Sequence, residues 1–323
     1  MAFELTQLQS VTDDWYEKQL NDIWVEDSVL LWSLMAGKKM QENFVTAGEK
    51  VDGGQKIRVF LEYGKANVSD YGAATEINNT PAEIINAARF RWAGKVAWNS
   101  INLDEQVQNS GKAALVDLAY AKLDNIQKSI REEMGSDVYA SAANADAILG
   151  LGNLFNATTS AEYGSIREDD MAQWKANVIT TARAIGFTVL QEIRRAASIN
   201  QSTKGKPNLY ITTELLKDAY EAGLQVQARY QDTRLASAGF ANVLFGGVPV
   251  VADDKQTTGV CDALNLPYLK MKTHRKYAFT KPTWRIFSES QPDLLVANTR
   301  WVGQLVCSNR KAHCRHTNLT APA

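Results

Sequence analysis

Cysteine and histidine are scarce in this sequence, and so are the sites that depend on them. The 323 residues include three cysteines, Cys261, Cys307 and Cys314. An odd number of cysteines argues against a disulfide framework and favours a reducing compartment. The three histidines are His274, His313 and His316. Most acid–base and metal sites draw on histidine, so its scarcity argues against an enzyme.

Long apolar runs and cofactor motifs are also missing. No apolar run reaches 18 residues, so we expect no transmembrane helix and no membrane partner. The first residues lack a basic segment followed by an apolar one, so we expect no secretory signal. The sequence has no Gly-x-x-x-x-Gly-Lys-Ser/Thr loop, no Gly-x-Gly-x-x-Gly, no Gly-x-Ser-x-Gly and no Cys-x-x-Cys. We therefore predict no cofactor and no catalytic residue.

One cluster does resemble a set of metal ligands, and it consists of Cys307, His313, Cys314 and His316. Zinc needs four ligands that converge tetrahedrally. In a strand, the adjacent His313 and Cys314 point to opposite faces, so the four side chains would not converge. We therefore predict no metal site here.

Paired charges are the remaining candidates for chemistry. A helix start, where the helix dipole favours acidic residues, explains Asp169-Asp170. A turn explains Asp253-Asp254. A metal-dependent hydrolase that uses Asp253 and Asp254 stays an alternative, and it would need a histidine or a further carboxylate nearby. Arg194-Arg195, with Lys204 and Lys206, is interpreted as a solvated helix end that could also touch phosphate.

Charge is balanced overall but unevenly distributed. The chain has 35 lysines and arginines against 36 aspartates and glutamates, a net charge of −1. Residues 1–62 hold 11 acidic and 6 basic residues, a net charge of −5, whereas residues 270–316 hold 10 basic and 2 acidic residues, a net charge of +8. These ends are either two solvated faces, or surfaces that meet opposite charge on neighbouring subunits or, for the basic end, nucleic acid.

The beginning of the chain reads as a helical arm. Thr12 is the expected cap, and acidic residues follow it in the first turn. Large apolar residues then recur close to helical spacing from Trp15 to Leu34, and Gly37 is the expected stop. So many apolar groups indicate packing on the protein's own core or on a neighbouring molecule.

An extended hairpin is predicted next. Apolar and polar residues alternate over 57–63, where the apolar Phe60 is an exception, and a second alternating run covers 89–101. About 25 residues rich in glycine, alanine, asparagine and aspartate separate the two runs, and a loop of that length usually has a function. An isolated hairpin is marginally stable, so we expect it to lie on another surface.

A long helix is the strongest single prediction. Asn102 and Glu105 have the spacing of a capping box, and apolar residues step by three or four up to a stop at Gly135. Beyond it the pattern alternates between helix, predicted over 169–200 and 214–230, and strand, predicted at 209–211, 243–245 and 248–251. Strands at 277–279, 284–287 and 301–307 follow, with turns at Pro292 and Asn309.

This order of elements resembles the major capsid proteins of tailed bacteriophages, which have the HK97 fold. The resembling segments are Gly53-Gly54-Gln55-Lys56-Ile57, Arg89-Phe90-Arg91-Trp92, Gly150-Leu151-Gly152-Asn153-Leu154 and Gly246-Gly247-Val248-Pro249-Val250-Val251. The resemblance implies an α+β chain with five parts. They are an N-terminal arm (1–50), an extended E-loop hairpin (51–102), a spine helix (103–134), an A-domain (135–265), and peripheral-domain strands with a C-terminal tail (266–323).

The resemblance also implies a structural role. Copies would self-assemble as pentamers and hexamers into an icosahedral shell around double-stranded DNA, which they would contact non-specifically. About eleven residues precede the first predicted helix, too few for a fused scaffolding segment, so we expect a separate scaffolding protein. A portal protein and a decoration protein are the other expected partners. The expected locations are the virion and, during assembly, the host cytoplasm.

The arm and the hairpin supply the predicted subunit-interface residues. Arg58, Glu62, Arg89 and Arg91 would pair with neighbours, and Trp15 and Trp24 would anchor the arm; their plain alternatives are exposed charges and ordinary core aromatics. Some family members join Lys to Asn between subunits, and we expect no such link at Lys65 and Asn67. An encapsulin-type cargo shell is the rival assembly, and the long arm favours the phage capsid.

Overall fold

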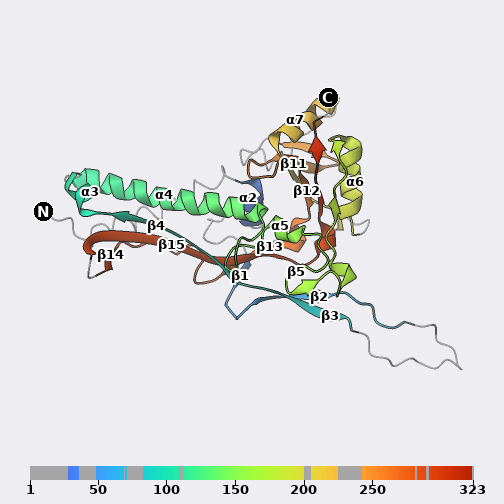
Figure 1. Cartoon of the computed structure of the whole chain (residues 1–323), viewed down its shortest axis with the longest axis horizontal. Coiled ribbons are helices and arrows are strands. Elements are labelled where there is room, and N and C mark those ends of the chain that lie inside the picture. The colour runs from blue at the N-terminus through green and yellow to red at the C-terminus, as the bar shows by residue number, and fades with distance from the viewer. Residues whose placement is uncertain are drawn as a thin grey trace.

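The computed structural model describes residues 28–35, 49–68, 70, 83–108, 112–199, 205–224, 242–280, 282–288 and 291–321. Three parts are visible in Figure 1: a long helix on a narrow sheet, a second sheet flanked by helices, and a two-stranded ribbon that projects from their junction. No helix in these ranges is both long and apolar enough to cross a membrane.

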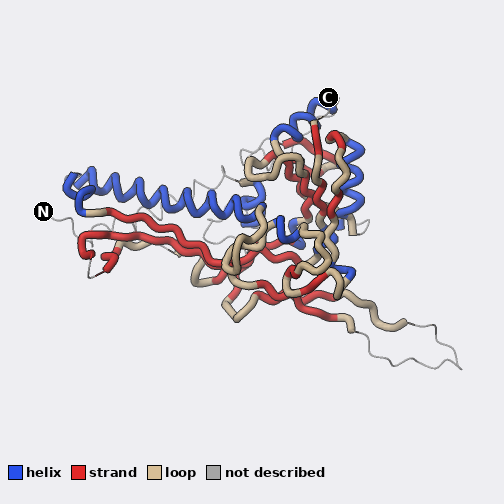
Figure 2. The backbone as a smooth tube through the Cα atoms, in the orientation of Figure 1, coloured by secondary structure: helices blue, strands red, loops and turns tan. Residues whose placement is uncertain are grey.

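The narrow sheet has the strand order β1-β13-β15-β14, and β4 also pairs with β15. Its strands are β1 (Glu49–Val51), β4 (Ala93–Ile101), β13 (Leu269–His274), β14 (Arg285–Ser288) and β15 (Gln291–Cys307). All nine residues of β4 pair antiparallel with β15. This long pairing makes the extended track that Figure 2 shows beneath the long helix.

The long helix α4 (Lys112–Tyr139) lies along this track. Its 28 residues span roughly 42 Å at 1.5 Å per residue. The side chains that hold it there share one buried cluster with the two strands: Ala119, Leu123, Ile126, Ile101, Ala297 and Trp284. The short helix α3 (Leu103–Gln108) precedes it. Its predicted capping box is confirmed, because the Glu105 amide donates to Asn102 Oδ1 at 2.9 Å and the Asn102 amide donates to Glu105 Oε2 at 3.2 Å.

The predicted stop of the spine helix at Gly135 was wrong. The helix continues to Tyr139 because Met134, Val138 and Tyr139 are buried in the main core. That packing outweighs the cost of a glycine inside a helix, about 1 kcal/mol. At Gly135 the helix passes α2 (Val29–Met35), where an added Cβ would lie 3.5 Å from the Cβ of Ser28.

The second sheet has six strands in the order β10-β11-β9-β12-β16-β7. They are β7 (Val178–Ile179), β9 (Leu209–Thr212), β10 (Asn242–Phe245), β11 (Val248–Ala252), β12 (Cys261–Leu264) and β16 (Cys314–His316). The helices α6 (Phe187–Ala197) and α7 (Glu214–Gly223) pack beside it (Figure 1). The predicted strand at 209–211 and the predicted pair of strands around Gly246-Gly247 are confirmed.

The end of the chain joins the six-stranded sheet. β16 pairs with β12 and β7 of the six-stranded sheet, and β17 (Leu319–Thr320) pairs with β8 (Arg183–Ala184). The chain therefore leaves the narrow sheet at Cys307 and returns to the six-stranded one.

The predicted helix over 169–200 was wrong over its first half. The structure has a 3₁₀ turn η2 (Ala172–Trp174), then β7 and β8, and α6 begins only at Phe187. Trp174 and Val178 have helical spacing in the sequence, but Trp174 packs in the core and Val178 pairs in the sheet. The predicted helix from 214 ends at Gly223, and residues 225–241 lie outside the described ranges.

Three smaller predictions also need correction. The second hairpin strand is two strands, β3 (Ile85–Phe90) and β4, which pair with different partners. Residues 277–279 form no strand, because Phe279 has φ +54°. Pro292 lies within β15 and is not a turn. Of the predicted arm helix, only α2 falls within the described ranges.

The main core lies where the three parts meet. It joins α2, the end of α4, the root of the ribbon and both sheets. The remaining short elements border this junction: α5 (Leu151–Leu154), β5 (Glu162–Tyr163), β6 (Ile166–Arg167), η5 (Leu266–Tyr268) and η6 (Arg310–Ala312).

Candidate subunit interface

The projecting ribbon consists of β2 (Ile57–Glu62) paired antiparallel with β3. Figure 1 shows it leaving the body of the protein at the side away from α3. Alternation along β2 leaves Arg58, Phe60 and Glu62 exposed on one face. In the observed register, Arg58 lies opposite Arg89 and Glu62 lies opposite Ile85. The structure therefore brings three of the four predicted hairpin residues to one exposed face.

Sequence reasoning missed the apolar part of this face. Phe60 is 77% exposed and Ile85 is 71% exposed. Aromatic residues and arginine are the residue types enriched in protein interfaces. The available signal was Phe60 itself, which breaks the alternation of β2 by placing an aromatic residue at a polar position.

The opposite face of the ribbon is buried and fixes its root. Ile57 and Leu61 pack in the main core with Phe90, whose ring meets the ring of Tyr163 edge-on with centroids 5.2 Å apart. The root is thus held by ordinary core packing, and no residue in the described part of the subunit covers its exposed face.

A tight turn clamps the backbone at this root. Between β5 and β6, Gly164 and Ser165 have φ +64° and φ +60°, as a two-residue hairpin turn requires. The Arg89 amide donates to the Gly164 carbonyl at 2.7 Å, and the Ser165 hydroxyl donates to the Arg89 carbonyl at 3.2 Å. Backbone contacts on both sides of Arg89 therefore set the direction of its exposed side chain.

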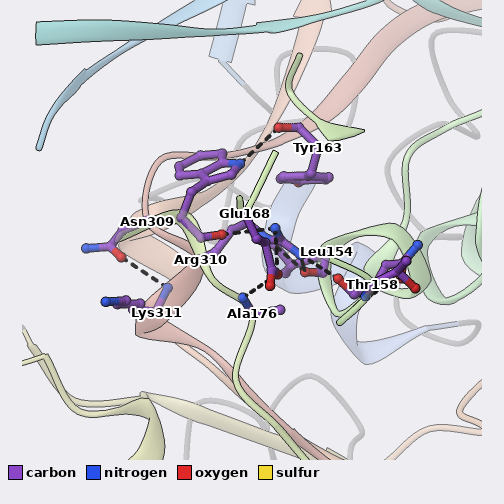
Figure 3. Close-up of polar contacts among 10 residues, drawn as sticks. Leu154, Thr158, Tyr163, Glu168, Ala176, Asn309, Arg310 and Lys311 are labelled. Carbon is purple, nitrogen blue, oxygen red and sulfur yellow. Dashed lines mark hydrogen bonds and ion pairs between the residues drawn. The ribbon is translucent and has the colours of Figure 1, made fainter. Parts of the chain in front are cut away.

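A buried ion pair lies next to Tyr163, the residue that precedes the turn (Figure 3), and Arg310 Cζ is 5.2 Å from the centroid of the Tyr163 ring. Arg310 Nη1 lies 3.2 Å from Glu168 Oε1, and both side chains are almost fully buried. The guanidinium also donates to the carbonyls of Leu154, Trp174 and Asn156 at 2.8–3.0 Å. Burial lowers the pKa of Arg310, and the neighbouring Glu168 opposes that shift. The pair ties η6 to the loops on which the ribbon root rests.

The other predicted interface residues are not on the ribbon face. Arg91 is exposed in the connection between β3 and β4, where its carbonyl accepts a hydrogen bond from Gln304 Nε2 at 3.2 Å. Trp15 and Trp24 lie outside the described residues. Lys65 and Asn67 are exposed just beyond β2, and their predicted lack of a covalent link stays a prediction.

Asp253, the carboxylate of the hydrolase alternative, holds α2 in place. Its Oδ2 accepts hydrogen bonds from the Ser28 hydroxyl at 2.9 Å, the Val29 amide at 2.8 Å and the Tyr139 hydroxyl at 2.7 Å. Burial, and then the nearby carboxylate, raises the pKa of Tyr139 well above its usual range. These hydrogen bonds hold the N-terminal end of α2 against the end of α4. Among the described residues, no group of three or more His, Cys, Asp or Glu side chains could hold a metal ion.

The cysteine–histidine cluster is likewise part of the core. His313 is fully buried and its Nδ1 accepts a hydrogen bond from the Asn265 amide at 3.1 Å. Burial lowers the pKa of His313 to about 3, and burial raises the pKa of Cys307 to about 12. Neutral imidazole and protonated thiol are the forms that suit packing against apolar neighbours.

Comparisons with solved structures identify the fold. A chain of the cyanophage A-1(L) capsid asymmetric unit matches with a TM-score of 0.68 and 17% identity over 93% of this chain and 94% of that one. The capsid of a native GTA particle matches with a TM-score of 0.57 and 10% sequence identity, over 84% of this chain and 88% of that one. The SrpI encapsulin of Synechococcus elongatus PCC 7942 matches with a TM-score of 0.54 and 11% sequence identity, over 85% of this chain and 86% of that one.

These likenesses show that the chain has the HK97-like fold of those capsid and encapsulin chains. The predicted α+β fold class is therefore confirmed, and the chain has the fold of tailed-phage major capsid proteins. No family model and no curated sequence matches the chain.

Proposed function

We propose that this chain is the major capsid (head) protein of a tailed bacteriophage. Its copies would form pentamers and hexamers, which would close into an icosahedral shell around double-stranded DNA. The observation that carries this proposal is the match to the cyanophage capsid chain, which spans nearly the whole of both proteins. The role is structural, and no residue is assigned to catalysis.

The ribbon supports assembly on physical grounds. A two-stranded ribbon that stands alone is marginally stable in water. Here the described part of the ribbon leaves Phe60 and Ile85 uncovered within the subunit. A second copy that covers this face would remove apolar area from water, at about 25 cal/mol per Å². Repeated around a closed shell, such contacts add through multivalency.

The proposal extends to the partners of such a shell. A separate scaffolding protein would guide assembly in the host cytoplasm, a portal protein would occupy one vertex, and a decoration protein would bind outside. Packaged DNA would be held mainly by confinement and by non-specific phosphate contacts. The virion would be the final location of the protein.

An encapsulin-type shell is the second candidate, and the match to the SrpI encapsulin favours it. The two candidates differ in content. Particles that protect genome-length double-stranded DNA from nuclease support the phage capsid. Particles that retain a co-purified protein and contain no protected DNA support the encapsulin.

Assembly is tested by sedimentation and negative-stain electron microscopy of the full chain and of a chain that lacks residues 1–27. The deletion must stop there, because α2 is part of the core and is held by Asp253. We expect shells, tubes or capsomers from the full chain and loss of closed shells after the deletion. A sharp monomer or dimer under all conditions, also with a crowding agent or a scaffolding protein, contradicts the proposal.

A further inference from the structure

A cationic cleft lies at the root of the ribbon, where β2 and β3 leave the body of the protein (Figure 1). Its volume is about 700 Å³, which is within the range of small-molecule sites. Four cations line it, namely Lys56, Arg58, Arg89 and Lys272, and the lining includes no aspartate or glutamate. The cleft therefore has the size and the charge to bind a small anion.

The carboxylates that lie nearest in the chain already pair with cations. Glu49 lies 3.5 Å from Lys272 and 3.3 Å from Lys270, so one carboxylate is shared between two ammonium groups. Asp52 pairs with Arg275, which does not line the cleft, at 2.8 Å. The positive charge of the cleft is therefore only partly compensated by the described part of the subunit.

The other three cations of the cleft carry the uncompensated charge. Lys56, Arg58 and Arg89 are exposed and form no ion pair with a described residue. Arg58 lies directly opposite Arg89 in the ribbon, and like charges at such positions destabilise a pair of strands. An anion bound between the two guanidinium groups would replace this repulsion by attraction.

A glycine turn forms another wall of the cleft. Gly53 and Gly54 have φ +133° and φ +113°, a region that favours glycine, and neither places a side chain over the cleft. None of the amides of residues 53–56 donates a hydrogen bond to a described backbone carbonyl. The turn is fixed from behind, because Trp92 Nε1 donates to the Gly54 carbonyl at 2.7 Å. Exposed backbone amides in such a turn are a common element of phosphate sites.

The cations indicate the same kind of anion. The guanidinium group of arginine offers N–H donors in a planar fork that matches the oxygens of phosphate, and lysine binds phosphate as a point charge. A single phosphate could contact only some of the four cations. A chain of phosphates offers charged oxygens at every link and can contact all of them at once.

We propose that the cleft at the ribbon root binds a chain of phosphates, either inorganic polyphosphate or the phosphates of a nucleoside triphosphate. Arg58 and Arg89 bind phosphate oxygens from the two strands of the ribbon, and Lys56 and Lys272 bind them from either side. Binding removes the repulsion across the ribbon and so stabilises its root. The site is complete in one subunit and does not depend on the proposed shell.

Isothermal titration calorimetry of dispersed full-length subunits with tripolyphosphate, at constant ionic strength, tests this inference. Arg58→Gln with Arg89→Gln should weaken binding at least about tenfold, and orthophosphate should bind the wild type at least about tenfold more weakly than tripolyphosphate. The matched control, Lys175→Gln with Arg195→Gln, removes two exposed cations that do not line the cleft. Its affinity should stay within about twofold of the wild type.

Thermal unfolding of the same proteins shows whether the cleft variant has kept its fold. Without an anion, Arg58→Gln with Arg89→Gln should unfold no earlier than the wild type, because the repulsion between the strands is gone. Tripolyphosphate should raise the unfolding temperature of the wild type and of the control variant, but not that of the cleft variant. Lys56→Gln lies outside the strands and provides a second variant, which should also weaken binding.

The outcomes separate the two sources of phosphate. Tighter binding of ATP than of tripolyphosphate assigns the cleft to a nucleotide, and equal or weaker binding assigns it to inorganic polyphosphate. Equal affinity of the wild type and the cleft variant for tripolyphosphate overturns the inference. Citrate that binds as tightly as tripolyphosphate also overturns it, as does a cleft variant that loses affinity only for duplex DNA. A chain that never assembles contradicts the shell proposal and leaves these binding results unchanged.

Discussion

Arg310 and Glu168 show how a single buried pair can support an exposed site. Arg310 of this ion pair packs over the ring of Tyr163, which directly precedes the turn that holds the backbone of Arg89. Removing one partner of a buried pair leaves an uncompensated charge, which is far more costly than losing the attraction itself. The sequence offers little sign of this, since Arg310 looks like any arginine in a basic region until the loops that surround it are known.

Arg310→Ala should therefore lower the free energy of unfolding by about 3–5 kcal/mol. Arg167→Ala, which removes the exposed pair with Glu162 at 3.3 Å, is the control and should cost less than about 1 kcal/mol. Urea denaturation of dissociated subunits, followed by tryptophan fluorescence, measures both. Equal losses for the two variants would contradict the assigned role of Arg310.

His313 should make stability depend on pH. Its pKa is lowered from about 6.5 in the unfolded chain to about 3 in the fold, so the unfolded chain binds the proton more readily between these values. The stabilisation that His313 contributes to the fold is fully present above pH 6.5. It declines as the pH falls towards 3, by at most about 1.4 kcal/mol per pH unit.

Unfolding curves of the wild type and of His313→Asn between pH 7 and pH 4 test this sign. We expect the wild type to lose stability faster than the variant as the pH falls, whatever the stability of the variant at pH 7. Parallel curves would show that His313 does not supply this dependence.

At the scale of elements, the two faces of the ribbon allow the proposed assembly and the folding of the subunit to be tested separately. Phe60 and Leu61 are neighbours in β2, but Phe60 is exposed and Leu61 is buried. Phe60→Ser with Ile85→Ser should change the free energy of unfolding by less than about 0.5 kcal/mol and strongly reduce the assembled fraction. Leu61→Ala should instead cost about 2–5 kcal/mol of folding stability. Denaturation and sedimentation of the same preparations measure both effects.

Replacement of two glycines by alanine should change the stability of the subunit in opposite directions. At Gly135 in α4 a Cβ fits at ordinary contact distance, so Gly135→Ala should stabilise the subunit by about 0.5–1 kcal/mol. At Gly164 a Cβ would lie 2.9 Å from the Phe90 ring on a backbone with φ +64°, so Gly164→Ala should cost roughly 2–3 kcal/mol. Thermal unfolding of dissociated subunits compares them, and a destabilised Gly135→Ala would contradict the account of α4.

Local signals predicted the elements better than they predicted the sheet partners. The capping box at Asn102 and Glu105 and the strands β2, β9, β10 and β11 follow from short-range rules. The helix that was expected around Trp174 and Val178 failed because its apolar spacing serves the core and a sheet instead. The pairing of β16 with β12 depends on residues some fifty positions apart, which no local pattern encodes.

At the scale of the whole molecule, a body with a shared core carries a ribbon whose outer face no described residue covers. α4 on the β4–β15 track and the six-stranded sheet share one core, whereas the ribbon is packed on one face only. The charged residues of the exposed ribbon face, Arg58, Glu62 and Arg89, could be predicted from the sequence, and their role at a subunit interface stays a prediction. The apolar residues of that face could not be predicted, because they depend on the register between β2 and β3.

The most direct test of the central claim is a cryo-electron microscopy reconstruction of particles assembled from the full chain. The account predicts a closed icosahedral shell in which the face formed by Arg58, Phe60, Ile85 and Arg89 is covered by a neighbouring copy. A small discrete oligomer, or a shell in which this face remains open to solvent, would contradict it.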